Sequence, residues 1–333
     1  MISMQKSITT AVVSEPYVYG LSRSGVLMTF TLSPAESKQA VDRLRYSFAN
    51  AGDGNDIELI DGHLVLSDYG GIAVYSLTDP KLPRPVGRFR PPHSAISYTL
   101  TRDHDRLYVI GRGHVACFDV ANVARPRLIF ESTSGHHWWT GCVIGGRLLL
   151  GECAPNNPNL ALPNATPRDG VAVMEIEPEG LKEIGFISIK GAFQLFATDA
   201  KHALACLDPE SLTHLGQTRP YGRAVLIDVT NPAAPAVGPV QANASERSAI
   251  LVNRLDGKVL VCPGYVFPLE KGFVRKRVEF PISPECTIRD GSPYHPKASG
   301  DWVALPCDRV LVVIRLAEGD QAGDPVKQVK DGE

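Results

Sequence analysis

Residues 228–235 read Asp-Val-Thr-Asn-Pro-Ala-Ala-Pro, and they follow an apolar, β-forming run that begins at Ala224. Related text occurs at 78–80 (Thr-Asp-Pro) and at 119–126, where Asp, Val, Asn and Pro return in the same order. Asp, Asn and Pro favour turns because they tolerate or preset the backbone angles that turns require. Each copy therefore predicts a strand, a turn and a crossing to a further strand. A phrase that recurs along a chain indicates an internal repeat.

The second repeat unit gives the order of its strands most plainly. Strands are expected at 57–60, 63–67, 72–77 and 85–90, and the third unit repeats them at 96–100, 106–110, 115–120 and 127–130. Asp61-Gly62 predicts a tight hairpin between the first two strands, because both residue types tolerate positive φ. Each unit is therefore expected to form a four-stranded antiparallel sheet.

A sheet of this kind has two apolar faces that it cannot bury alone, and radial stacking of several such sheets buries both. We therefore predict an all-β chain that forms a single closed β-propeller of about seven four-stranded blades, with six or eight as alternatives. Two stacked β-sandwiches are the rival architecture. The single domain spans 1–333, with blades at 7–48, 53–90, 92–131, 134–190, 191–241, 243–283 and 284–320 plus a C-terminal tail. Residues 326–329 are a candidate outer strand for the last blade.

The phrase at 228–235 resembles the LVIVD-repeat type of β-propeller, whose units end a strand on Asp-Val-Ser/Thr-Asp/Asn-Pro. The resemblance is good in units two, three and five, while units four and six lack the phrase. It covers about two thirds of the chain. It implies a blade fold and no shared catalytic residues.

Composition excludes several classes of function. The net charge of −2, with scattered Lys and Arg, gives no electrostatic case for binding nucleic acid or a membrane surface. No run approaches the roughly 18 apolar residues that would span a bilayer. The first ten residues are polar, and the seven cysteines form no CxxC pair, so a cytoplasmic location is expected.

The connections between strands are expected to differ between the two ends of the blades. Label the strands of a blade A to D from the centre outward. Because neighbouring strands are antiparallel, D–A and B–C connections emerge at one end, and A–B and C–D turns at the other. Three successive B–C connections are predicted to be long, at 152–170, 208–222 and 263–272. Long connections are often functional, so we expect them to form a partial lid over the channel mouth.

Most histidines of the chain fall near that same end. We expect acid/base or hydrogen-bonding roles for His93, His136, His137, Glu152, His295 and Tyr221, and substrate-binding roles for Trp138, Arg112, Arg223, Tyr265, Asp68 and His214. A histidine titrates near neutral pH, and a carboxylate can tune it. One of the adjacent residues Trp138 and Trp139 must point away from the other and pack between blades.

Two functions of different class follow from this pattern. The first is a small-molecule enzyme with a site at the lidded mouth of the channel, using rim histidines for lyase, isomerase, cyclase or hydrolase chemistry. No cofactor is the simpler expectation; if a divalent metal is present, His93, His136 and His295 are its candidate ligands. The alternative is a non-enzymatic β-propeller that binds a protein partner. The fold by itself does not decide between them.

Overall fold

The architecture was analysed in a computed structural model of the chain. The structure describes residues 2–3, 8–22, 26–32, 42–44, 56–68, 71–90, 97–111, 113–152, 168–189, 192–207, 223–242, 250–254, 257–262, 265–270, 273–274, 278–279, 297–299, 302–307 and 310–315. All regular elements in these ranges are strands, and they form antiparallel sheets. Contacts divide the chain into two compact units.

The first unit comprises Met1–Arg90, Ile250–Glu270 and Arg275–Glu333 and holds four sheets. They are β2 (Ile8–Ser14), β3 (Tyr17–Ser22), β4 (Leu27–Thr31) and β5 (Asp42–Leu44); β6 (Asp56–Ile60), β7 (His63–Asp68), β8 (Gly71–Ser76) and β9 (Arg84–Phe89); β22 (Ile250–Arg254), β23 (Gly257–Cys262), β24 (Tyr265–Glu270) and β26 (Val278–Glu279); and β27 (Lys297–Ser299), β28 (Trp302–Cys307), β29 (Val310–Arg315) and β1 (Ile2–Ser3). Buried side chains of neighbouring sheets form its cores, for example Leu21 with Leu64, and Ile8 with Ala304.

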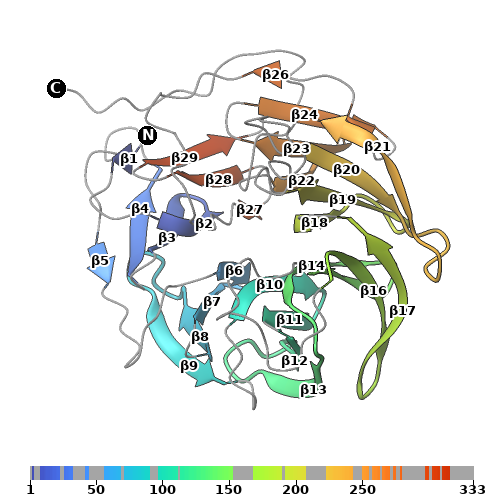
Figure 1. The fold of residues 1–333 in the computed structure, drawn as a ribbon. Coiled ribbons are helices and arrows are strands. Elements are labelled where there is room, and N and C mark those ends of the chain that lie inside the picture. Colours follow the sequence, from blue (N-terminus) through green and yellow to red (C-terminus); the bar gives the residue numbers. More distant parts are fainter. Residues whose placement is uncertain are drawn as a thin grey trace. The chain divides into compact units, whose positions relative to one another are not determined.

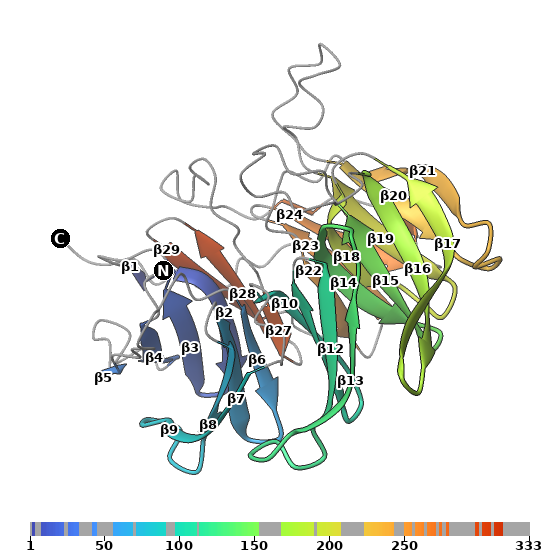
Figure 2. The ribbon, with the colours of Figure 1, turned by 60° about the horizontal axis from the view of Figure 1, so that its bottom comes forward.

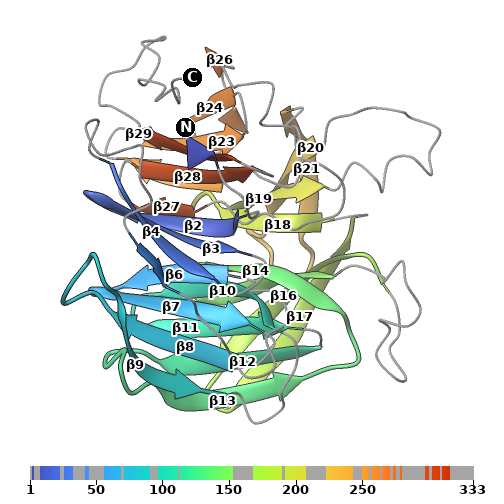
Figure 3. The same ribbon diagram turned by 90° about the vertical axis from the view of Figure 1, so that its left-hand side faces the viewer.

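The last sheet of this unit combines both ends of the chain. Ile2 and Ser3 pair with Leu311 and Val310, so β1 is the outer strand beside β29 (Figure 3). The candidate outer strand at 326–329 lies outside the described residues. Backbone pairing with β1 was not predicted, because a two-residue strand is too short to leave a periodic pattern in the sequence.

The second unit, Pro91–Ala249 with Lys271–Val274, holds three sheets. They are β10 (Ser97–Asp103), β11 (Arg106–Gly111), β12 (His114–Asp119) and β13 (Arg127–Thr133); β14 (Trp138–Ile144), β15 (Arg147–Glu152), β16 (Gly170–Glu177) and β17 (Gly180–Ser188); and β18 (Ala192–Ala197), β19 (His202–Leu207), β20 (Arg223–Asp228) and β21 (Ala236–Ala242). In Figure 1 these sheets run from cyan through green to yellow and orange. The short β25 (Phe273–Val274) also belongs to this unit.

Two apolar layers hold the second unit together. One lies between the sheets β10–β13 and β14–β17, and its members include Tyr108, Trp138 and Leu150. The other lies between β14–β17 and β18–β21, and it includes Leu149 and Val225. Both faces of the middle sheet, β14–β17, which Figure 2 draws in green to yellow-green, are therefore buried. This is the stacking that a four-stranded repeat needs for its two apolar faces.

The recurring phrase forms the same turn in its three copies. Ser76 Oγ, Asp119 Oδ1 and Asp228 Oδ1 each accept the backbone N–H two residues later, at Thr78, Ala121 and Thr230. A backbone bond then closes each turn, from Leu82 to Asp79, Arg125 to Asn122 and Ala234 to Asn231. A third bond joins the residue after each C strand to the A–B turn of its own sheet. The turn predicted for the second, third and fifth repeats of the sequence is therefore confirmed, down to its hydrogen bonds.

One predicted long connection is wrong. Cys262 pairs with Tyr265, so only two residues separate β23 from β24, and Tyr265 begins a strand instead of lying in a lid. The β-forming residues at 265–267 continue the hairpin as a strand, so the segment predicted to be a long connection at 263–272 begins β24 instead. The connections after Glu152 and Leu207 do run to Gly170 and Arg223, where the next strands begin.

Candidate functional site

The candidate site is built around Glu152, the last residue of β15. Trp138, the first residue of β14, lies directly opposite it in the sheet. The Trp138 side chain is 2% exposed and the Glu152 side chain is fully buried. The indole Nε1–H of Trp138 donates to Glu152 Oε1 across 3.1 Å. A buried carboxylate requires such donors, because an unpaired charge in the interior is strongly unfavourable.

Arg168 supplies the compensating charge. Its Nε–H donates to Glu152 Oε2 at 2.5 Å and its Nη2–H to Glu152 Oε1 at 2.6 Å. This is the bidentate geometry that a planar guanidinium forms with a carboxylate. Hydrogen bonding to Glu152 is the main reason that the pKa of Arg168 is raised above its usual value. Arg168 therefore stays charged, and it fixes the end of the connection that returns to β16.

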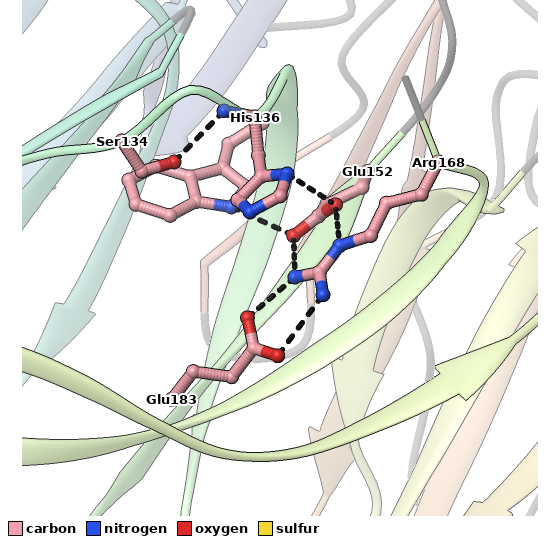
Figure 4. Close-up of polar contacts among 6 residues, drawn as sticks. Ser134, His136, Glu152, Arg168 and Glu183 are labelled. Carbon is pink, nitrogen blue, oxygen red and sulfur yellow. Dashed lines mark hydrogen bonds and ion pairs between the residues drawn. The ribbon is translucent and has the colours of Figure 1, made fainter. Parts of the chain in front are cut away.

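The outer edge of the same guanidinium binds a second carboxylate. Nη1–H donates to Glu183 Oε1 at 3.0 Å, and Nη2–H donates to Glu183 Oε2. Glu183 belongs to β17 and is 34% exposed (Figure 4). The face of the guanidinium lies over the ring of Phe186, with Cζ 4.0 Å from its centre. A cation over an aromatic face is attracted to it, so Arg168 is held on two edges and one face.

Gly170 makes this arrangement sterically possible. A Cβ atom at this position would lie 2.2 Å from the carbonyl oxygen of Ile187 and 2.4 Å from the ring of Phe186. Both distances are far below van der Waals contact, so only glycine lets β17 and its Phe186 ring approach so closely. β17 thus places the ring of Phe186 against the face of the Arg168 guanidinium.

The two adjacent histidines have different surroundings. His136 precedes β14, is 26% exposed, and has its Nδ1 3.7 Å from Glu152 Oε2 (Figure 4). Its backbone N–H donates to Ser134 Oγ. His137 is 5% exposed, with its ring 6.5 Å from that of Trp139. The sequence left open which histidine takes part in the site, and His136 is the one beside Glu152.

The arrangement has few groups left for chemistry. Both oxygens of Glu152 accept hydrogen bonds from Arg168, and one also accepts from Trp138. Four of the five N–H donors of Arg168 are engaged with carboxylates. Counting ionised side chains, two carboxylates and one guanidinium leave a net charge of −1. The cluster can hold its connections in place, and His136 and Glu183 are its accessible edges.

For several residues predicted for the site, the structure does not describe the side chain. His93, Arg112, His214, Tyr221 and His295 are outside the described residues. Asp68 ends β7, Arg223 begins β20 and Tyr265 begins β24, and their side chains are also outside the description. Of the predicted set, the structure therefore brings His136, Trp138 and Glu152 together. Trp138 is the buried member of its pair, as the alternation along a strand requires.

Arg168 and Glu183 were missed by the sequence analysis. Arg168 stands two residues before the glycine that opens β16, and β15 ends on Glu152, so the two meet when the hairpin closes. A buried glutamate at the end of an apolar strand was a signal that a cation should be sought nearby. Glu183 gave no such signal, because it lies in an outer strand beside another charged residue, Lys182.

No group of three or more His, Cys, Asp or Glu side chains in the described part of the chain is arranged to hold a metal ion. Of the three candidate metal ligands only His136 is described, so that hypothesis stays a prediction. Within the same residues, no helix has the length and apolar character to cross a bilayer.

Comparison with known proteins supports the fold. No protein-family model matches the chain, and no curated protein shows significant similarity. Among solved structures, the WD40 domain of Neurospora crassa Pan2 is 12% identical with a TM-score of 0.64, over 94% of this chain and 92% of that one. The WD40 β-propeller domain of Doa1 is 11% identical with a TM-score of 0.62, over 96% of both chains. The N-terminal domain of Nup159 is 10% identical with a TM-score of 0.52, over 94% and 89%. At these identities the likeness concerns the fold alone, and the chain has the fold of a β-propeller.

Proposed function

We propose that the chain is a closed, seven-bladed propeller of the LVIVD-repeat type that acts as a protein-interaction module. The partner is expected to bind at the end of the sheets where D–A and B–C connections emerge. Charge supports a protein partner over nucleic acid, because the net charge is only −2. Propellers commonly use such broad ends to recognise other proteins.

One observation carries this proposal. The ionisable groups of the candidate site bind one another: Glu152 accepts from Trp138 and Arg168, and Arg168 also donates to Glu183. A general base needs a free lone pair directed at its substrate. Glu152 would have to break a buried ion pair to provide one. The cluster is better suited to holding two connections in place, the one before β14 and the one that ends at β16, so that they form a rigid surface for recognition.

One of the solved structures that share the fold is a protein complex. One of the matching structures contains Dbp5 bound to Nup159 and Gle1, and its matched chain has a TM-score of 0.51 over 94% of this chain. Binding in that complex is a property of those proteins. For this chain it raises the expectation of a protein partner without naming one.

A photo-crosslinking experiment tests the proposal. Gly135 lies in the connection before β14 and is exposed, so benzoylphenylalanine at this position would touch a partner bound at that end. Pro178, exposed in the turn between β16 and β17, is the matched control at the opposite end of the same sheet. We expect cross-linked protein from position 135 and none from 178. Equal yields, or none from 135 in a lysate of the source cells, would contradict the proposal.

The second candidate function is a small-molecule enzyme. It is favoured by the 3.7 Å separation of His136 Nδ1 and Glu152 Oε2, which places an imidazole beside a carboxylate, the pair of groups that general acid/base catalysis uses. His136→Ala should then abolish turnover and leave the protein folded, because this side chain is partly exposed. Turnover that survives the substitution would remove His136 from the reaction.

A further inference from the structure

The two carboxylates bound to Arg168 differ in how firmly they are held. Glu152 is fully buried and belongs to the ion pair that fixes the end of β15. Glu183 is 34% exposed on the outer strand β17. Exposed ion pairs contribute little to stability, whereas removing one partner of a buried pair is strongly unfavourable. Glu183 is therefore the replaceable partner, and Glu152 is the permanent one.

The guanidinium edge behind Glu183 is already organised to bind a carboxylate. Glu152 fixes the Nε and Nη2 edge, and the ring of Phe186 supports the guanidinium face. Nη1 and Nη2 then point together at a single carboxylate group. The guanidinium therefore needs no further ordering when its occupant changes, which removes the side-chain part of the entropic cost of binding.

We propose that the Nη1 and Nη2 edge of Arg168 is the binding site for an acidic residue of the partner, and that Glu183 occupies it in the free protein. This inference rests on the proposed interaction function and specifies the chemistry of the partner. On binding, the partner's carboxylate takes the two hydrogen bonds, and Glu183 turns to solvent. The internal contact is thus autoinhibitory: it lowers the affinity of this edge for every acidic segment by the same factor.

The surroundings favour a carboxylate over a phosphate group. Glu152 lies on the other edge of the guanidinium, and Asp169 is its neighbour in the chain. A phosphate ester carries close to two negative charges at neutral pH, so it would be repelled more strongly than a carboxylate. A carboxylate also reproduces the two-oxygen geometry of Glu183.

The test is a titration of the whole protein with a short peptide, N-acetylated and C-terminally amidated, that contains a single Glu among Gly and Ser. Nuclear magnetic resonance of the Arg168 Nε–H and Trp138 indole N–H groups reports occupation of the site. Glu183→Ala is expected to tighten binding about two- to fivefold, the range that loss of an exposed competing ion pair allows. A peptide with Gln in place of Glu should cause no shift at Arg168.

Glu175→Ala is the matched control, because it removes the same charge from an exposed position on the neighbouring strand β16. It should leave the affinity unchanged. Equal effects of the two variants, equal binding of the Gln peptide, or tighter binding of a phosphoserine peptide would each overturn the inference. Cross-linking through position 135 does not depend on Glu183. A partner captured there, with no effect of Glu183→Ala on peptide binding, would overturn this inference alone.

Discussion

The Glu152 and Arg168 pair determines how the end of the middle sheet of the second unit is built. Glu152 ends a strand whose other residues are mostly apolar, and its side chain has no exposed surface. Its charge is acceptable there only because Arg168 and Trp138 supply three hydrogen bonds. Arg168 is 24% exposed and keeps Glu183 as a second partner. The two members of the pair should therefore respond differently to substitution.

Arg168→Met is expected to lower the free energy of unfolding by about 3–5 kcal/mol, because it leaves a buried carboxylate without its cation. Adding Glu152→Gln removes that charge and keeps an acceptor for Trp138 Nε1–H. The double variant should therefore be more stable than Arg168→Met alone, by about 1 kcal/mol or more.

Denaturant unfolding of wild type, Arg168→Met and the double variant measures both the loss of stability and its partial recovery. Glu175→Gln, an exposed glutamate in the same sheet, is the control and should change stability by less than about 0.5 kcal/mol. A double variant that is less stable than Arg168→Met would contradict the assignment of the loss to an uncompensated buried charge.

At the scale of elements, the recurring turn also joins neighbouring sheets. Tyr19 Oη–H donates to the Pro80 carbonyl oxygen of the next sheet at 2.9 Å in the first unit. In the second unit the Pro232 carbonyl oxygen lies against Gly185 of β17. The proline of the phrase therefore packs its turn on the preceding sheet. In these two copies the contact gives the phrase a role beyond turning the chain.

Gly185→Ala tests this contact. The new Cβ would lie 2.0 Å from the Pro232 carbonyl oxygen, so the turn and the strand would have to separate. We expect a loss of about 1–3 kcal/mol in the free energy of unfolding, as overpacking typically causes. Gly180→Ala in the same strand meets only the Ser132 hydroxyl, at 2.9 Å, and should cost less than about 1 kcal/mol. Similar losses for both variants would show that the turn can move freely.

The same turns make stability depend on pH. Hydrogen bonds from the Thr230 hydroxyl and backbone N–H lower the pKa of Asp228. Because the unfolded value is about 3.9, the stabilisation from ionised Asp228 is fully present above that pH and is lost as the pH falls through the folded value. Asp228→Asn keeps the oxygen acceptor and removes the charge. The stability difference between wild type and Asp228→Asn should favour wild type at pH 6 and disappear in acid. A difference that stays constant from pH 6 to pH 2.5 would contradict the prediction.

The sequence predicted repeated elements well and the site incompletely, for physical reasons. A turn such as Asp61-Gly62 is specified by local backbone preferences, and Asp61 and Gly62 indeed have φ values of 43° and 72°. Glu152 and His136 were found because the ends of B and D strands emerge together. Arg168 could not be assigned, because its role depends on where the chain returns after the fifteen residues (153–167) that separate it from Glu152. Partners across a long connection are set by tertiary packing, which no local pattern encodes.

At the scale of the whole chain, the decisive element is β1. Ile2 pairs with Leu311 and Ser3 with Val310, so the first residues complete the sheet that the last strands build. A strand at the open edge of a sheet invites pairing with other molecules, and β1 covers part of that edge. Pairing of the two ends is also what the proposed closed propeller requires.

Deleting residues 1–5 should therefore lower the unfolding temperature and promote aggregation. The control, Ile2→Ala with Ser3→Ala, keeps the backbone pairing and should do neither.

Disulfide trapping examines the same pairing directly. Directly opposite residues in an antiparallel pair alternate between closely and widely spaced types. One of the two double variants, Ile2→Cys with Leu311→Cys or Ser3→Cys with Val310→Cys, should thus bring its sulfurs within bonding range. That variant should form an intramolecular cross-link under mild oxidation and unfold at a higher temperature, because the link restricts the unfolded chain. Ile2→Cys with Val313→Cys is out of register by two residues and is the control. Cross-linking of the control at an equal rate, or of neither in-register variant, would mean that the ends do not meet in this register, and the proposed closure would fail with them.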